Sequence, residues 1–334
     1  MSKSFSSGKG TGIFFHADPD GIVSAANVIL SLKSTEGAAF RMPALFPIRS
    51  HSEIPGTFGK SKGKFARAYV LDLSSVTEKE ISGLSEKTTI IDHHEQEPII
   101  APGVIHLNPR FKKLPAYPVS YQTYVLFGGR DWQAFVGVVD DWGVPILHSF
   151  ADKMWRPYGW RGTQESLYLY SDAGRIGFAI EAGVKLYGDK KGALIAMNAL
   201  LKSITPHDFL EGKNPESRTL LKAAEKIFSE VSGTLGKAGA KYVGKRLEIY
   251  EIRSKYNIRR EVIQRLKIER PGKYVLVYSK SKAPGKVEFS IRGPGKIPSL
   301  IAPYGGGHPE AGGGTLPKKN LGSFLEYLKT QIDG

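Results

Sequence analysis

The sequence predicts an α/β protein with two domains: an N-terminal, doubly wound, mostly parallel sheet and a smaller C-terminal α/β domain. Short apolar runs alternate with helical patterns through the first half, as in a parallel sheet with helices on both faces. The pattern changes beyond the glycines between residues 233 and 244, and a chain of 334 residues has room for two cores. We expect a larger domain over 1–200, a helical connector over 201–244 and a second domain over 245–334, with a cleft between the domains.

In the first domain, each apolar run predicts one element. The expected elements are strands over 12–16, 67–72, 88–92 and 104–108, and helices over 22–32, 174–186 and 192–201. The runs 119–127 and 132–139 are too short for periodicity to separate a helix from a buried strand, so both remain open.

In the second part, a helical pattern over 220–231 precedes Gly233, Gly236, Gly239 and Gly244, which are expected to form a loose hinge. The order then becomes strand, helix, strand, hairpin and helix. The expected elements are strands over 247–252, 273–278 and 287–292, and helices over 259–267, 298–302 and 321–332, with a glycine-rich loop before the last of these.

The positive charge is concentrated near the C-terminus. The chain carries a formal net charge of +15, and residues 201–334 contain 25 Lys and Arg against 13 Asp and Glu, so that this part alone carries +12. A strongly basic domain is expected to meet a polyanion, most simply a nucleic acid. A lysine-rich surface that serves only solubility or heat tolerance is the alternative.

The composition also limits the setting of the protein. The sequence contains no cysteine, which excludes disulfides and thiolate metal sites and makes the cytoplasm the expected location. No run approaches 18 apolar residues, so we expect no membrane-spanning helix. Residues 1–10 are rich in Ser, Gly and Lys without an apolar core, and are expected to be a flexible lead rather than a signal peptide.

Acidic and imidazole side chains gather where apolar runs end. The segment HADPDG (16–21) follows the first expected strand, IIDHHE (90–95) closes a later one, Asp72 ends a strand between them, and a fourth apolar run stops at Asp140 and Asp141. For any one segment, an Asp that caps the next helix is the simpler interpretation. Four together predict a shared site, because the ends of parallel strands converge on one crevice. Carboxylate and imidazole donors without thiolates suit manganese or magnesium.

These motifs, in this order, resemble those of the DHH phosphoesterases. The stretch YGGGHPEAGG (304–313) resembles the glycine-rich signature of the DHHA1 domain, and FSIRG (289–293) resembles the strand of that domain that carries a substrate-binding Arg. The resemblance spans about residues 12–315. The Asp-x-Asp-Gly order, the size and the basic charge are similar to those of the compact archaeal RecJ-like exonucleases, including the Hef-associated type. The resemblance implies a DHH catalytic domain followed by a DHHA1 nucleic-acid-binding domain.

The resemblance implies two metal ions, Mn²⁺ or Mg²⁺, and a role for each site residue. Asp72 is expected to bridge the ions, and His94 to face the scissile phosphate as a donor. Asp92 is expected to hold the His pair in place, with a helix cap as the alternative. The expected metal ligands are Asp18, Asp20, Asp72, His93, Asp141 and His16. His16 stands two residues before Asp18, where the family commonly has four, and Asp140 competes with Asp141, so these two assignments stay open.

The glycine run is expected to bind substrate. Gly305, Gly306 and Gly307 would let the backbone approach a phosphate or sugar, His308 adds a polar side chain, and Arg292 adds a planar cationic fork. A plain flexible turn is the alternative. Four more basic residues are expected either to guide a nucleic-acid strand or to be simply solvated: Arg253, Lys255, Arg259 and Arg260.

The expected function is that of a metal-dependent exonuclease that hydrolyses single-stranded DNA or RNA by two-metal activation of water. The alternative is a phosphodiesterase for very short oligonucleotides or cyclic dinucleotides, or a nucleotide 3′,5′-bisphosphate phosphatase. A catalytically weak partner of a repair or replication complex is a third possibility, which the intact acids and imidazoles disfavour. The +12 segment favours the first, because a dinucleotide needs few phosphate contacts. The expected partners are single-stranded nucleic acid, repair or replication proteins, and further copies of the chain in a dimer or trimer.

Overall fold

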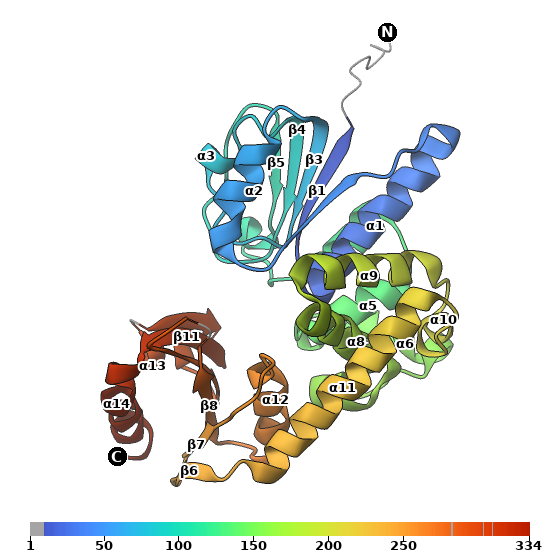
Figure 1. Ribbon diagram of the computed structural model, residues 1–334. Coiled ribbons are helices and arrows are strands. Elements are labelled where there is room, and N and C mark those ends of the chain that lie inside the picture. Colours follow the sequence, from blue (N-terminus) through green and yellow to red (C-terminus); the bar gives the residue numbers. More distant parts are fainter. Residues whose placement is uncertain (1–9, 282, 303, 309) are drawn as a thin grey trace. The chain divides into compact units, whose positions relative to one another are not determined.

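The computed structural model describes residues 10–281, 283–302, 304–308 and 310–334, without the side chain of His308. The chain divides into two compact units, Met1–Ala224 and Glu225–Gly334, which are drawn in Figure 1. The first contains a five-stranded parallel sheet and the second a six-stranded mixed sheet. The predicted fold class, a doubly wound parallel sheet followed by a smaller α/β unit, is confirmed.

The sheet of the first unit has the strand order β2-β1-β3-β4-β5, and all its pairs are parallel. Its strands are β1 (Thr11–His16), β2 (Ala44–Ile48), β3 (Phe65–Leu71), β4 (Ser85–Ile91) and β5 (Val104–Leu107). Strand β2 contains Pro47 and was not among the predicted strands. Because β2 is an edge strand, a residue without an N–H donor is tolerated there.

Alternating side chains of β1 contribute to two cores. Ile13 and Phe15 pack into the core that contains α1 (Pro19–Glu36), whereas Phe14 packs into the core that contains α2 (Ile54–Ser61) and α3 (Glu78–Ile81). Figure 1 shows α2 and α3 on one face of this sheet and α1 on the other. Burial of both faces explains why the strands are almost continuously apolar, as parallel strands are.

The turn from β1 into α1 is specified locally. Asp18 caps the helix by accepting a hydrogen bond from the Gly21 N–H at 3.0 Å, and Pro19 starts the first turn, where no N–H is needed. A Cβ atom at Gly21 would lie 2.3 Å from the carbonyl oxygen of His16, so only glycine allows this close approach. The helix ends at Gly37, whose φ is 52°.

The rest of the first unit is helical. The two undecided apolar runs form α4 (Val119–Phe127) and α5 (Asp131–Asp140). The fourth acidic segment therefore follows a helix, which decides between the two interpretations left open for the run 132–139. Five further helices follow: α6 (His148–Tyr158), α7 (Gln164–Tyr170), α8 (Asp172–Tyr187), α9 (Asp189–Lys202) and α10 (Pro206–Leu210).

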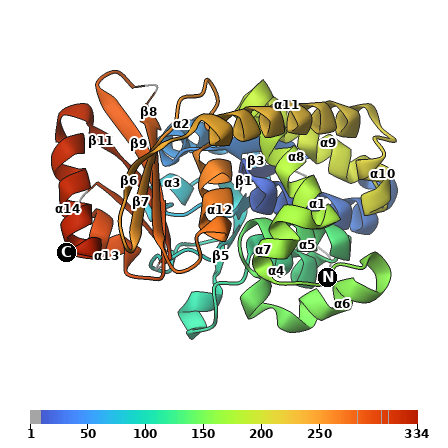
Figure 2. The ribbon, with the colours of Figure 1, turned by 90° about the horizontal axis from the view of Figure 1, so that it is seen from below.

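Helix α11 (Pro215–Lys237) spans the boundary between the units and includes Gly233 and Gly236, so these two glycines belong to a helix and not to a hinge. The second sheet has the order β10-β11-β9-β8-β7-β6. Its elements are β6 (Ala240–Val243), β7 (Leu247–Glu251), α12 (Arg259–Glu269), β8 (Tyr274–Lys280), β9 (Lys286–Arg292), α13 (Ile297–Ile301), β10 (Gly305–His308), β11 (Ala311–Pro317) and α14 (Leu321–Asp333). Figure 2 shows α12 and α14 on opposite faces of this sheet.

The expected glycine-rich loop is a strand, because Gly305, Gly306 and Gly307 form most of β10 and pair with β11. A Cβ atom at Gly305 would lie 2.2 Å from the carbonyl oxygen of Gly313, so the glycines allow the two strands to approach each other. Within the described residues, the structure contains no helix with both the length and the apolar character that a membrane crossing requires.

Candidate metal centre

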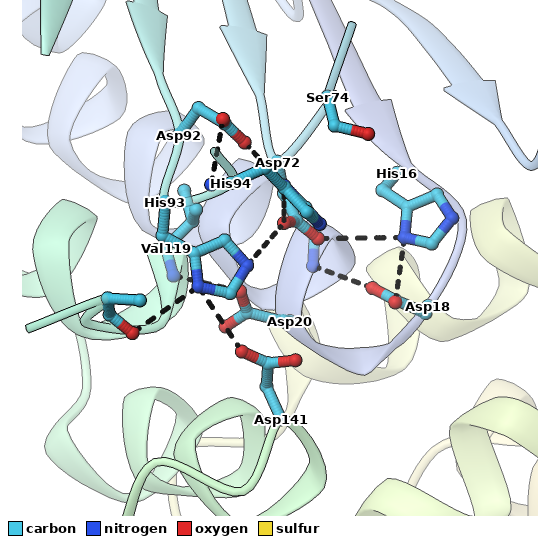
Figure 3. A network of polar contacts seen from close by, with 12 residues as sticks. His16, Asp18, Asp20, Asp72, Ser74, Asp92, His93, His94, Val119 and Asp141 are labelled. Atoms are coloured by element: carbon cyan, nitrogen blue, oxygen red, sulfur yellow. Dashed lines mark hydrogen bonds and ion pairs between the residues drawn. The ribbon is translucent and has the colours of Figure 1, made fainter. Parts of the chain in front are cut away.

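The candidate site lies at the carboxyl ends of β1, β3 and β4. Phe15, Leu71 and Ile91 are neighbours in register across these strands, so the residues that follow them emerge side by side. Asp20 is added by the first turn of α1 and Asp141 by the end of α5. Figure 3 shows the side chains from these five elements turned toward one another.

Three groups of side chains offer donor atoms that lie within 4.8 Å of one another. They are the groups His16, Asp18 and Asp72; Asp72, His93 and His94; and Asp20, His93 and Asp141. All six expected ligands are therefore brought together, and Asp72 and His93 each belong to two groups. Oxygen and imidazole nitrogen donors in this number fit Mn²⁺ or Mg²⁺.

Asp72 is placed between two groups. Its Oδ1 lies 3.4 Å from Nε2 of His93, and its Oδ2 lies 3.6 Å from Nδ1 of His16. The residue is 4% exposed and has a φ of 58°, a left-handed backbone that is uncommon for residues other than glycine and typical of functional sites. The two oxygens of one carboxylate thus face opposite sides, as in a ligand shared by two cations.

Asp20 connects the site to helix α4. Its carboxylate accepts hydrogen bonds from the N–H groups of Val119 at 2.8 Å and Ser120 at 2.9 Å, at the start of that helix. Burial, together with the nearby Asp72 charge, raises the pKa of Asp20 to about 7. Each oxygen accepts one bond in this arrangement, and a carboxylate oxygen has a second lone pair for a cation.

Asp141 rather than Asp140 lies with the ligands. Its Oδ2 is 3.5 Å from Nδ1 of His93. Desolvation raises the pKa of Asp141 well above its ordinary range, and the carboxylates of Asp20 and Asp72 act in the same direction. Asp140 is the last residue of α5, is buried, and lies near Gly177 of α8, where a Cβ atom would be 3.8 Å from its own.

The two histidines of the pair have different surroundings. His93 is 5% exposed and lies between Asp72 and Asp141. His94 has a side chain that is 32% exposed, and its Nδ1 lies 2.8 Å from Oδ1 of Asp92. Asp92 also accepts hydrogen bonds from the His94 backbone N–H and from Gln96. Its buried carboxylate therefore orients the His94 ring and leaves Nε2 as the ring nitrogen available to a ligand.

His16 lies beside Asp18, with Nδ1 2.7 Å from Oδ2 of that carboxylate. Burial acts to lower the pKa of His16, but the charges of Asp18 and Asp72 raise it well above its ordinary value. Burial acts to raise the pKa of Asp18, and His16 and Arg49 lower it instead. The position of His16 fits a ligand role despite its short spacing from Asp18.

Arg49 is a site residue that the sequence analysis missed. It follows β2, and its Nη1 donates to the carbonyl oxygen of Ala17 at 2.6 Å. Its guanidinium also binds both oxygens of Glu181 on α8, and Lys185 binds the same carboxylate. The only available signal was the short apolar run before Arg49, which Pro47 obscured.

The predicted substrate-binding residues lie in the second unit, which is described by itself. Arg292 is the last residue of β9, is half-buried, and its Nη1 donates to the carbonyl oxygen of Ile291. The three glycines lie on β10, and the side chain of His308 is outside the described residues. Arg259 is bound to Glu288 and Ser279, so it is part of the framework rather than a solvated cation.

The chain thus combines a five-stranded parallel sheet, a second α/β unit and a cluster of side chains that could hold metal ions. The known protein-family profiles gave no match to this chain, and no curated protein matches its sequence. The chain is similar in structure to RecJ of Thermus thermophilus in complex with Mn²⁺, with a TM-score of 0.61 and 14% identity over 97% of this chain and 52% of that one. It therefore spans about half the length of that RecJ.

Two further solved structures have the same fold. The DHH domain of a protein described as a member of a ribosomal protein family has a TM-score of 0.66 and 14% identity, over 98% of this chain and 88% of that one. PggH of Vibrio cholerae, a pGpG-specific phosphodiesterase, has a TM-score of 0.53 and 14% identity, over 98% of this chain and 100% of that one. At these identities, the likeness shows the fold.

Proposed function

We propose that this chain is a DHH phosphoesterase of the compact RecJ-like type, which hydrolyses single-stranded DNA or RNA with the aid of two divalent ions, Mn²⁺ or Mg²⁺. The observation that carries the proposal is the placement of Asp72, whose two oxygens face His93 and His16 in different donor groups. The crowding of acids supports it, since buried carboxylates whose pKa values are raised need a cation to be ionised together.

Each residue has a defined task in this proposal. Asp18 and His16 would hold one ion, Asp20, His93 and Asp141 would hold the other, and Asp72, which lies between the two sets, would contribute to both. When bound, two such ions activate water and relieve the charge that develops on the phosphoryl oxygens. His94, oriented by Asp92, donates to a phosphate oxygen through Nε2. The buried network of Asp92 keeps this ring in place.

The choice of a polymer as substrate rests on charge. Residues 201–334 carry +12, which exceeds what a dinucleotide needs for its few phosphates. In this proposal, Arg292 and the backbone of Gly305, Gly306 and Gly307, with His308, bind the nucleic acid away from the cleaved bond. Repair or replication proteins and further copies of the chain remain the proposed protein partners.

A short substrate is the second candidate. The specific observation in its favour is the structural likeness to PggH, which is named for its action on pGpG and is matched over 100% of its length with a TM-score of 0.53. On this candidate, the chain is a phosphodiesterase for dinucleotides or very short oligonucleotides, or a phosphatase for nucleotide 3′,5′-bisphosphates. The same metal centre serves both candidates.

One assay tests the function and separates the candidates. DNA and RNA of two and of about twenty nucleotides, labelled at either end, are incubated with the full chain and Mn²⁺. We expect ladders from the long single strands, and the end that keeps its label reveals the direction of digestion. Cleavage of the dinucleotides alone would support the second candidate, and no cleavage of any substrate would reject both the exonuclease and the dinucleotide phosphodiesterase.

The matched variant is Asp72→Asn, which removes the charge while keeping a side chain that tolerates the left-handed backbone better than alanine does. We expect at least a thousandfold loss of turnover, because about 4 kcal/mol of transition-state stabilisation depends on the ions. Asp72→Ala should be equally inactive. Ser75→Asn is the control, since Ser75 is exposed, lies in the same loop and also has a positive φ. Near-normal turnover of Asp72→Asn would contradict the two-metal assignment.

A further inference from the structure

The second unit contains a groove of about 790 Å³ that the proposed catalysis does not use. One wall is a single face of α11, because its lining residues Lys226, Gly233 and Lys237 recur at helical spacing. The other wall is formed by β6, with Lys241, and by the segment that follows β7, with Tyr256. In Figure 1, β6 directly follows the end of α11, so the two walls are close in the chain.

The groove is held open by a fixed contact between its walls. Ser254, in the segment after β7, donates from Oγ to Oε1 of Glu230 on α11 at 2.7 Å. The same hydroxyl accepts a hydrogen bond from the backbone N–H of Tyr256 at 3.0 Å. This contact ties the segment to the helix and fixes where Tyr256 lies. The shape therefore exists before any ligand arrives, which lowers the entropic cost of binding.

The lining is strongly basic. Glu251 lies 3.6 Å from Lys241 and 3.9 Å from Arg253, and Glu230 is engaged by Ser254. The cations of the lining outnumber its two carboxylates; they are Lys226, Lys237, Lys241, Arg253 and Lys255. Three of them, Lys226, Lys237 and Lys255, are exposed and have no carboxylate partner among the residues that the structure describes. A row of such ammonium groups along a groove favours a polyanion over a single small anion.

Two glycines line the groove, Gly233 on the α11 wall and Gly239 just beyond the end of that helix, and packing requires neither. A Cβ atom at Gly233 or Gly239 would meet no atom within 4 Å. Glycine inside a helix costs about 1 kcal/mol relative to alanine, and Gly233 lies inside α11. Without side chains at these two positions, a bulky ligand can approach the backbone of the groove. The Tyr256 ring, with the Lys255 ammonium 5.2 Å from its centre, adds an aromatic surface next to a cation.

We propose that this groove binds the sugar–phosphate backbone of single-stranded nucleic acid, with phosphates on Lys226, Lys237 and Lys255 and a base against Tyr256. The nature of the polyanion rests on the proposed function. The groove is a binding surface of the second unit that is additional to Arg292 and the glycines of β10, so a substrate must be several nucleotides long to use it.

The test compares two triple variants of the full chain. The groove variant is Lys226→Ala with Lys237→Ala and Lys255→Ala. The control variant removes three exposed lysines of the same unit outside the groove, namely Lys245→Ala, Lys318→Ala and Lys319→Ala. Affinity for a labelled single-stranded twenty-mer is measured without divalent metal at several salt concentrations, and hydrolysis of a dinucleotide is measured with Mn²⁺.

We expect the groove variant to bind the twenty-mer at least tenfold more weakly than the control variant at low salt. Its slope of log affinity against log salt should fall by about 2, since each phosphate contact on a single strand contributes about 0.7. Its rate on a dinucleotide should be unchanged. Equal affinities of the two variants would overturn the proposal, and so would a poly-glutamate chain that displaces the strand equally well at equal charge. Because affinity is measured without hydrolysis, an inactive wild-type protein would reject the proposed function and leave this test intact.

Discussion

Asp72 combines two unfavourable features, a left-handed backbone and a buried position among other acids. It has a backbone conformation that costs about 1 kcal/mol, and it occupies a buried position among three other carboxylates. Natural sequences keep such conflicts where function requires them. In the proposed function, bound cations would neutralise the crowded acids.

Most of the candidate site could be predicted from the sequence, because its residues stand at or just after the ends of strands that are easy to recognise. His16, Asp72 and His93 follow that rule. For the fourth segment, the choice between Asp140 and Asp141 stayed open. It depends on how the end of helix α5 directs each side chain, which the periodicity of the sequence does not reveal. Arg49 could not be found, since it depends on the pairing of an edge strand that contains a proline.

The His pair should divide the work. His93 belongs to two donor groups and is buried, so we expect His93→Ala to lose bound metal. We expect His94→Ala to retain nearly all of its metal and to lower turnover by a factor of about 10² to 10⁴, because a donor to the phosphate is removed. Metal content of the purified variants, measured by mass spectrometry, decides between the two roles.

His51→Ala is the control for this comparison. His51 is exposed and interacts with Ser74 in a neighbouring loop, outside the donor groups. We expect it to keep both metal and turnover. If His93→Ala and His94→Ala lose metal equally, His94 is a ligand and the phosphate-donor role is wrong.

At the scale of elements, apolar patterns predicted the buried strands and helices well and the glycine-rich segments badly. Strand β10 is a run of glycines with no side chain to indicate a strand, and only the tight pairing with β11 makes it one. Gly233 and Gly236 continue α11 although glycine is a poor helix former. In both places, the observed structure differs from the one that local propensity favours. The contacts that cause the difference cannot be read from a single sequence.

Strand β7 carries a buried acid that should matter for stability rather than for catalysis. Glu248 is bound by Lys273 at 2.8 Å, by Arg270 at 2.8 Å and by the Tyr250 hydroxyl at 2.5 Å. We expect Glu248→Gln to destabilise the second unit by about 1–3 kcal/mol, because two cations lose a buried carboxylate partner. Hydrogen exchange of the β7 and β8 amides in the full chain measures this loss locally.

The pH dependence gives a second measurement of the same contact. Burial acts to raise the pKa of Glu248, but the bonds to Lys273, Tyr250 and Arg270 lower it overall. The stabilisation is therefore present above the unfolded pKa of about 4.3 and is lost as the pH falls through the folded value.

Glu326→Gln is the control, since Glu326 is 72% exposed and pairs with Lys329 on the same helix. A Glu248→Gln protein with unchanged protection at pH 7 would show that the network contributes little.

At the scale of the whole molecule, the candidate metal-binding residues and most of the net positive charge lie in different parts of the chain. The acids of the candidate metal centre belong to the first unit, whereas most of the net positive charge belongs to residues 201–334. This separation was visible in the sequence, because it needs only counting. The number of phosphates that a bound nucleic acid could contact depends on how many basic side chains lack an acidic partner. Ion pairs such as Arg259 with Glu288 lower that number.

Arg292 tests whether that charge serves a long substrate. If Arg292 binds the strand away from the cleaved bond, its interaction is equally strong in the ground state and the transition state. We therefore expect Arg292→Ala to raise KM for a single-stranded twenty-mer about tenfold and to change kcat by less than about threefold. Lys286→Ala, at the other end of the same strand, should leave both constants unchanged.

The wild-type affinity should also fall steeply with salt, because several phosphates release their counterions. A shallow salt dependence, together with equal rates on dinucleotides and twenty-mers, would instead favour the short-substrate enzyme. In that enzyme Arg292 would contact the reacting phosphate, and its loss would lower kcat rather than raise KM.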